Sequence, residues 1–213
     1  MERTLIIGAG AQAKYAVDII RLTRDMEPYG IVDVEDNPEI HGTTINGIPI
    51  LGALDDVISE MPGDVQVTLA HGNNQKKRRL AQRLQKLNLA FVSLIHPKAS
   101  VSESAKVGDG VIICANSTVM PNARIGHHVM IHANTVVEHD DELEDLVNLA
   151  PGVTLAGYVT VKRGAYVYTG ASVIPNIVVG EWSIVGAGAT VLEDVAPHDT
   201  VVGTPARSVK NNR

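Results

Sequence analysis

The 213-residue chain has little cysteine, few aromatic side chains and no excess of positive charge. Its single cysteine, Cys114, excludes a disulfide framework within the chain and argues against a cysteine-based zinc site. Aromatic residues make up only 3% of the chain, and a core of small and β-branched side chains suits short, flat strands better than a helical bundle. The formal net charge of -6 argues against a general nucleic-acid or membrane-surface binder, which normally presents a basic face.

Long apolar runs are missing as well. Residues 1–10 run directly into a strand-like segment without the layout of a signal peptide. No apolar run approaches the roughly 18 residues that are needed to cross a bilayer. We therefore expect a cytoplasmic protein without a nucleic-acid or membrane partner.

An aliphatic residue returns at every sixth position over the second half of the chain, without an insertion. These anchor residues are Ile95, Val101, Val107, Ile113, Val119, Ile125, Ile131, Val137, Leu143, Leu149, Leu155, Val161, Val167, Val173, Val179, Val185 and Val191. The residue four places after each anchor is small or β-branched, with the single exception of Asp141. A triangular coil explains this period, with one strand and one corner per hexad. Anchors 18 residues apart then stack inside a β-helix of five to six turns.

Residues 1–94 instead alternate between strand-like and helix-like segments, as is typical of a small parallel α/β domain. Strands are expected over 4–7, 31–33, 48–51 (a short edge segment), 65–70 and 91–94, and helices after Gly10, over 54–60 and from Asn74 to about Leu87. Asn74 is expected to cap the last helix. Its buried side would consist of Leu80, Leu84 and Leu87, and its basic residues 76–79 and Arg83 would form a solvated face. The repeat domain then covers residues 95–213.

The glycine turn, residues 8–13 with the sequence GAGAQA, ends the first strand and opens a helix. Backbone N–H groups and a helix N-terminus in such a turn can hold a phosphate. Asp33 lies about 20 residues beyond the turn, where such folds hold a ribose hydroxyl. A lone glycine turn is also a common tight connection between strand and helix, so the residues leave both interpretations open.

The segment Glu138-His139-Asp140-Asp141 coincides with the break in the small-residue column. A histidine between carboxylates can have its tautomer fixed and its basicity raised. The alternative is a surface histidine among solvated acids, and the residues alone do not decide between the two. Although four of the eight histidines fall within 127–139, a metal site is not expected, because adjacent histidines on a coil point in different directions and no cysteine joins them.

Taken together, these features resemble the family of sialic acid O-acetyltransferases and nucleotide-4-amino-sugar N-acetyltransferases, within the hexapeptide-repeat acyltransferases. The resemblance rests on segments 5–20, 47–52, 71–84, 94–102, 136–157 and 201–210. It implies a Rossmann-like N-terminal domain, a left-handed parallel β-helix with a C-terminal tail, and a homotrimer. It also implies acetyl-CoA as co-substrate between neighbouring β-helices, a nucleotide-linked amino sugar on the N-terminal domain, and no metal.

The resemblance further implies direct acetyl transfer. His139 would be the general base that takes a proton from the sugar amine, and Asp140 the acid that orients it. A backbone N–H near Gly157, 18 residues from His139, would meet the thioester oxyanion. By position, Asn148, Gly157, Thr169 and Ala187 correspond to acetyl-CoA contacts, and Arg207 and Lys210 to phosphate contacts or ordinary tail charges. Gly10, Ala11, Gln12, Asp33, Gly72 and Asn73 correspond to the nucleotide-sugar site, and His132 faces the sugar.

Three positions depart from the family pattern. Asn148 and Gln12 replace common histidines, and His132 stands where an asparagine is expected. These departures leave the sugar and the nucleotide base open. The alternatives are O-acetylation of a sialic acid or other free sugar, a non-catalytic protein that senses a nucleotide sugar, and an oxidoreductase suggested by the glycine turn. A β-helix offers no obvious hydride site, which weighs against the oxidoreductase.

Overall fold

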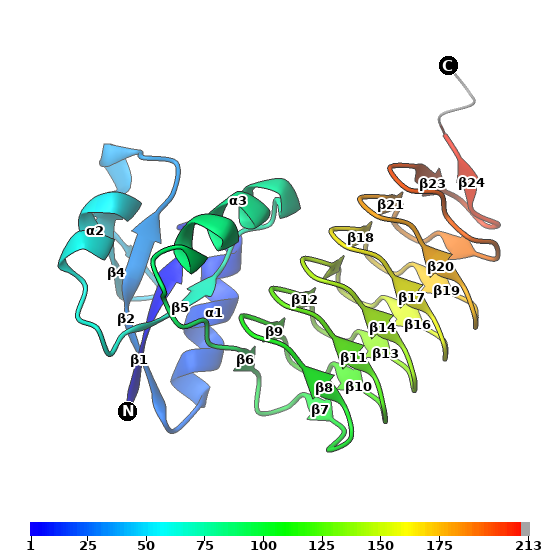
Figure 1. Ribbon diagram of the computed structural model, residues 1–213, viewed down its shortest axis with the longest axis horizontal. Coiled ribbons are helices and arrows are strands. Elements are labelled where there is room, and N and C mark those ends of the chain that lie inside the picture. The colour runs from blue at the N-terminus through cyan, green and yellow to red at the C-terminus, as the bar shows by residue number, and fades with distance from the viewer. Residues whose placement is uncertain (210–213) are drawn as a thin grey trace. The chain divides into compact units, whose positions relative to one another are not determined.

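The computed structural model describes residues 1–209, and the chain divides after Pro97 into two compact units (Figure 1). Unit 1 comprises residues 1–97 and unit 2 begins at Lys98. The division falls three residues beyond the boundary expected between residues 94 and 95. Lys210, which the resemblance matches to cofactor phosphates, lies outside the described residues.

Unit 1 contains a five-stranded sheet with the order β3-β4-β2-β1-β5. Its elements are β1 (Glu2–Ile7), α1 (Ala11–Leu22), β2 (Met26–Asp33), a 3-10 turn (Pro38–Ile40), β3 (Thr44–Ile45), β4 (Ile48–Ala53), α2 (Leu54–Glu60), β5 (Gln66–Leu69), α3 (Asn74–Gln85) and the short β6 (Leu94–Ile95). All pairings are parallel except that of β3 with β4. The prediction of 48–51 as an edge segment is wrong, because β3 pairs outside it.

The central strand β1 shows why this unit forms a covered parallel sheet. Leu5, Ile6 and Ile7 are all fully buried, as expected for a parallel strand that is packed on both faces. Of the last predicted strand, 91–94, Phe91 forms only an isolated bridge with Val67.

Helix α3 differs from the prediction in its cap and in its buried side. Asn73 caps it instead of Asn74, because its side-chain oxygen accepts the N–H of Lys76 at 2.9 Å. Leu87 follows the end of the helix and is 49% exposed. The prediction of a fully solvated basic face is wrong at Lys77, which is buried together with Ala81 and Leu84.

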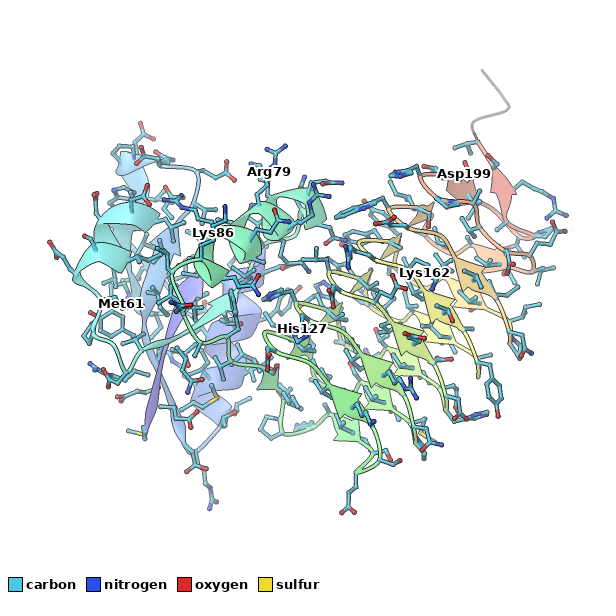
Figure 2. All side chains as sticks on the ribbon, viewed as in Figure 1. Met61, Arg79, Lys86, His127, Lys162 and Asp199 are labelled. Atoms are coloured by element: carbon cyan, nitrogen blue, oxygen red, sulfur yellow. The ribbon has the colours of Figure 1, made fainter. Side chains whose placement is uncertain are left out.

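The reason is the helical spacing, since residues at i, i+4 and i+7 share one face of a helix. Burial lowers the pKa of Lys77 to about 7, because a low-dielectric environment disfavours the charged form. Arg79, on the same helix, is exposed and extends outward (Figure 2).

Unit 2 is built from two-residue strands that recur every six residues. They are β7 (Ser100–Val101), β8 (Lys106–Val107), β9 (Ile112–Ile113), β10 (Thr118–Val119), β11 (Arg124–Ile125), β12 (Met130–Ile131), β13 (Val136–Val137), β14 (Glu142–Leu143), β15 (Asn148–Leu149), β16 (Thr154–Leu155), β17 (Thr160–Val161), β18 (Tyr166–Val167), β19 (Ser172–Val173), β20 (Val178–Val179), β21 (Ile184–Val185) and β22 (Thr190–Val191). The chain continues in β23 (Thr200–Val202) and β24 (Arg207–Ser208).

These strands form three parallel faces of a coil, as Figure 1 shows. We call them face 1 (β7, β10, β13, β16, β19, β22), face 2 (β8, β11, β14, β17, β20) and face 3 (β9, β12, β15, β18, β21). Each strand from β10 to β22 pairs with the strand 18 residues before it, as Thr118 does with Ser100. The 18-residue stacking that the period predicts is therefore observed.

The core of unit 2 consists of the anchor residues together with the small or β-branched residues four places after them, such as Val129 and Ala165. The anchors from Ile113 to Val191 are buried inside the coil. Val101 and Val107 pack against this core and are partly buried, whereas Ile95 is 39% exposed, so the series of inward anchors begins at Val101, one hexad later than predicted. The outside of the coil carries charged side chains such as Lys162 (Figure 2), which pairs with Glu144 of the preceding coil at 2.9 Å.

Candidate active site

The carboxyl ends of three parallel strands meet at one edge of the unit 1 sheet. Strand β1 lies between β2 and β5 and pairs with both, so the chain leaves it in opposite directions on its two sides. Ligands of open α/β sheets bind at such a switch point. The segments that follow these strands contain the glycine turn, Asp33 and the residues 71–73, so the structure brings the predicted nucleotide-sugar residues to the same edge.

The glycine turn leaves the start of α1 open. Gly8 has a φ of +119°, and a Cβ there would lie 2.7 Å from the backbone oxygen of Ala70, so the close approach of the two strand ends requires glycine. Gly10 precedes α1 in an extended conformation and makes no side-chain cap. The N–H groups of Ala11 and Gln12 are thus available for an anion, whereas that of Ala13 donates to the Gly10 oxygen at 3.1 Å. Gln12 lies beside Gly72, whose Cβ would be 3.4 Å from the Gln12 amide nitrogen.

The Asp33 carboxylate is hydrogen-bonded within its own loop. It accepts the N–H groups of Glu35 at 2.9 Å and Asn37 at 2.5 Å, and His41 lies 3.4 Å away. Burial raises the pKa of Asp33, but the N–H groups of Asn37 and Glu35 outweigh it and hold the pKa below its usual range. A ribose hydroxyl at Asp33 would therefore share a carboxylate that already orders the loop.

A second polar cluster at this edge was not predicted. Glu35 accepts hydrogen bonds from the ammonium group of Lys76 at 2.6 Å and 2.8 Å, and it lies 3.3 Å from His71. His71 also accepts the N–H of Asn73 at 3.0 Å. The signal in the sequence is the position of Glu35 two residues after Asp33, at the end of a parallel strand.

The second constellation lies on the corner of unit 2 that joins face 1 to face 2. His139 Nδ1 is 2.9 Å from a carboxylate oxygen of Asp140, and the two side chains are 48% and 33% exposed. The imidazole ring lies against Gly157 of the next coil, where a Cβ would be 2.6 Å from Cε1 and 2.7 Å from Nε2. Glycine at this position is thus what gives the ring its place.

Asp140 is held from the preceding coil as well. The Asn122 amide donates to its second oxygen at 3.2 Å. The hydrogen bond with His139 is the largest cause that holds the pKa of Asp140 below its usual range, and the hydrogen bond with Asn122 adds to it. An ionised Asp140 that accepts from Nδ1–H leaves the Nε2 lone pair free, so the pair has the form of an oriented general base.

A hollow of about 460 Å³ opens beside this pair. Lys106 and Arg124 supply positive charge along its wall. The hollow leaves space for a ligand next to Asp140. Its lining consists of Ser104, Lys106, Asn122, Arg124, Asp140 and Glu142.

Asp141 points into the coil and is fully buried. Its oxygens accept the N–H of Glu138 at 2.9 Å and the N–H of Val159, on the next coil, at 2.8 Å. Burial raises its pKa to about 7, against the opposing effect of the two N–H groups. Asp141 therefore braces the backbone of the corner that carries His139, and it explains the break in the small-residue column.

The residues matched to acetyl-CoA do not all gather at this corner. Gly157 does, whereas Thr169 and Ala187 are exposed on the corner that joins face 3 to face 1, where the N–H of Gly188 donates to the Thr169 oxygen at 2.9 Å. His132 lies on the same edge of the coil, directly after β12, in the column of Tyr168 and one position before that of Thr169, and it is buried. Gly157 on one side, and Thr169 and Ala187 on the other, thus flank face 1 at its two edges.

Two further matched residues lie away from both corners. Asn148 is fully buried in face 3, and neither atom of its amide has a hydrogen-bond partner within the described residues. Arg207 is exposed on β24, 3.9 Å from Glu193.

Comparisons with known proteins now bear on this arrangement. Residues 3–84 match the family model of the PglD N-terminal domain. Over 97% of its length the chain is 28% identical to the GDP-perosamine N-acetyltransferase of Escherichia coli O157:H7, of which it covers 96%. The structure is similar to that of PerB from Caulobacter crescentus in complex with CoA and GDP-perosamine, with a TM-score of 0.89, 30% identity and 96% of both chains covered. The chain belongs to the nucleotide-amino-sugar acetyltransferases of the hexapeptide-repeat family.

Membership of this family confirms the predicted fold class, a small α/β domain followed by a left-handed β-helix. The acetyltransferase domain of PglB from Neisseria gonorrhoeae, in complex with acetyl coenzyme A, has a similar structure, with a TM-score of 0.90, 29% identity, and 98% and 99% of the two chains covered. The serine acetyltransferase of Salmonella typhimurium is 36% identical over 145 residues, but the chain covers only 45% of that protein. The assignment to this family therefore rests on the full-length relatives.

Neither a metal centre nor a spanning helix is found in the part of the chain that the structure describes. Within residues 1–209, no three His, Cys, Asp or Glu side chains gather as a metal site would require. His127 instead accepts the N–H of Asp109 at 3.0 Å. None of the helices over the same range is long and apolar enough to cross a bilayer.

Proposed function

We propose that this protein transfers the acetyl group of acetyl-CoA to the 4-amino group of a nucleotide-linked amino sugar. The observation that carries the proposal is the His139–Asp140 pair, held at 2.9 Å with its free nitrogen over Gly157. Relatives crystallised with CoA and GDP-perosamine, or with acetyl coenzyme A, support the same two ligand classes.

In this proposal, His139 Nε2 accepts a proton from the sugar amine as the amine nitrogen attacks the thioester carbon. Asp140 stabilises the imidazolium that forms. The negative charge that develops on the carbonyl oxygen needs a fixed donor. The N–H of Gly157 is our candidate, since it donates to no other group among residues 1–209. When the carbon–sulfur bond breaks, the proton on His139 returns to the leaving CoA sulfur, which balances the reaction.

Unit 1 supplies the nucleotide site in this proposal. The open N-terminus of α1, with Gly10, Ala11 and Gln12, is suited to the pyrophosphate. The loop ordered by Asp33 and the Gly72–Asn73 segment flank it. The Asn73 side chain already caps α3 and its backbone N–H donates to His71, so a ligand here would share groups that the segment already uses.

We further propose a homotrimer, in which acetyl-CoA lies between the β-helices of two neighbouring copies. Within one copy, Thr169 and Ala187 lie on the opposite edge of face 1 from His139 and Gly157. A groove between the His139 corner of one copy and the Thr169 corner of its neighbour would bring both sets to one cofactor. Three copies around an axis close such a ring of head-to-tail contacts.

A thiol-release assay tests the reaction. Acetyl-CoA is combined with GDP-, UDP- and dTDP-linked 4-amino sugars and, separately, with free sialic acid. CoA release with an amino sugar nucleotide, and an amide in the product by mass spectrometry, is the expected result. Release with sialic acid alone would favour O-acetylation, and nucleotide-sugar binding by calorimetry without any turnover would favour a sensing protein.

Mixed assemblies test the shared site. His139→Ala and Ala187→Glu chains are each expected to be inactive. Co-expressed, they should recover activity, because random assortment leaves about a quarter of the sites with both native corners when each site draws on two copies. An inactive mixture, or a monomer by light scattering, would contradict the proposed assembly.

A further inference from the structure

Tyr158 occupies the same corner position as Asp140, one coil further along. Asn122, Asp140, Tyr158 and Asn176 stand 18 residues apart in four successive coils, and their φ angles are 63°, 59°, 63° and 63°. Asparagine and aspartate are the non-glycine residues that most readily adopt this left-handed conformation. Tyr158 is the one large side chain in this column, and it is 57% exposed, so burial does not account for it.

The tyrosine contacts both members of the general-base pair. Its ring meets the His139 imidazole edge-on, with centroids 5.2 Å apart and planes at 85°, a favoured geometry for two rings. Its backbone N–H donates to the His139 carbonyl at 3.2 Å. The hydrogen bonds from His139 and Asn122, and the neighbouring Tyr158 side chain, all act to lower the pKa of Asp140.

These contacts complete a ladder across three coils. Asn122 holds Asp140 from the coil before it, and Tyr158 acts on it from the coil after it. The same tyrosine limits the tilt of the imidazole, which also lies against Gly157. A tilt of that ring would break the bond of Nδ1 with Asp140 and redirect Nε2 away from an incoming amine.

We propose that Tyr158 is a positioning residue of the acetyl-transfer site, whose ring fixes the His139 imidazole and whose hydroxyl steadies the Asp140 carboxylate. The proposal rests on the proposed function for its catalytic consequence. Its structural content, that the orientation of His139 depends on Tyr158, stands independently of the reaction.

Three variants separate the parts of this role. Tyr158→Phe keeps the ring and removes the hydroxyl. Tyr158→Asn introduces the residue found at positions 122 and 176 of the same column, so the left-handed backbone is retained. Tyr29→Phe is the matched control, because Tyr29 lies in the middle of β2 under the guanidinium of Arg3, which is near the amino end of β1 and away from the glycine turn.

Steady-state kinetics supply the first readout. Tyr158→Asn should lower kcat about tenfold, and Tyr158→Phe about threefold, because a misplaced base costs rate rather than affinity. KM for acetyl-CoA should stay within about twofold of wild type in both, since neither change removes a cofactor contact. Tyr29→Phe should match wild type. Unchanged kcat in both Tyr158 variants would overturn the proposal.

The second readout is the nitrogen chemical shifts of His139, measured in protein labelled with 15N-histidine. Wild type should show Nδ1 protonated and hydrogen-bonded, and Tyr158→Asn should shift this signal toward a mixture of tautomers. Lost kcat with unchanged shifts also overturns the positioning role. If the wild type transfers no acetyl group, the proposed function fails, and the shifts alone still decide whether Tyr158 orients His139.

Discussion

The His139 corner of unit 2 and the glycine turn of unit 1 present their functional groups by different means. The glycine turn offers backbone N–H groups at a point where two strand ends approach so closely that Gly8 has no room for a side chain. The His139 corner offers side chains on a backbone that the repeat has already fixed. The equivalent positions of neighbouring coils hold Pro121, Gly157 and Pro175. A repeat can thus gain a reactive group by changing one corner, whereas the turn depends on its backbone path.

The sharpest test of this contrast removes the imidazole alone. His139→Ala should lower kcat by about 10²- to 10⁴-fold, the usual contribution of a general base. Nucleotide-sugar binding, measured by calorimetry, should stay at the wild-type level because unit 1 is untouched. His127→Ala, which removes an exposed histidine from another corner, is the control. More than a tenth of wild-type kcat in His139→Ala would rule out the assigned role.

The space under the imidazole is the next target. Gly157→Ala puts a Cβ within 2.7 Å of Nε2, so the ring must move, and a misplaced catalytic group costs on the order of 10²-fold in rate. The thermal midpoint should change little, because the displaced ring is half exposed. Gly63→Ala, in open space in unit 1, is the control. Wild-type kcat in Gly157→Ala would mean that the ring works equally well elsewhere.

The corresponding change in unit 1 should act through the backbone. Gly8→Ala combines a φ of +119° with a Cβ placed 2.7 Å from the Ala70 oxygen, and such strain costs about 1–3 kcal/mol. Unit 1 should therefore melt earlier while the coil keeps its transition, as followed by calorimetry. Nucleotide-sugar affinity should fall with it. An unchanged thermogram and affinity would show that the close approach is not needed.

The smallest effect concerns Asp141 and pH. Its pKa is raised to about 7 in the folded chain, against about 3.9 in an unfolded one. Between these values the folded state holds more protons, so the stability from this group is complete below about pH 4 and is lost as the pH rises through about 7.

Asp141→Asn has no such titration. The unfolding free energy of wild type, relative to that of Asp141→Asn, should thus fall with rising pH, by at most roughly 1.4 kcal/mol per pH unit. Denaturant melts at about pH 5 and pH 7.5, at one protein concentration, measure it. A difference that does not vary with pH would contradict the raised pKa.

Much of unit 2 could be predicted, because its period fixes both the fold and the neighbours of each residue. The burial of the anchors from Ile113 onward and the stacking of Gly157 on His139 both follow from that spacing. The same spacing of 18 residues also places Asn122 and Tyr158 beside Asp140. The partners of Asp141 could not be derived, because an inward polar side chain can bind several backbone groups.

Unit 1 was less predictable, because local signals there compete. Lys77 was assigned to a charged surface from its basic neighbours, although its spacing from Ala81 and Leu84 places it on the buried side. Asn73 and Asn74 are both good caps, and only the start of the helix distinguishes them. The Glu35 cluster depends on the meeting of two loops that are far apart in sequence.

The 18-residue register also separates two properties of the site, namely the length of the surface along which a cofactor can lie and the spacing of the acid–base residues. One whole coil inserted after Val191 would lengthen the surface along which a cofactor can lie, while the contacts among Asn122, Asp140 and Tyr158 keep their spacing. An insertion of any other length would shift the corners out of their columns. Cofactor reach and acid–base geometry can therefore evolve separately, provided that the chain grows by entire turns.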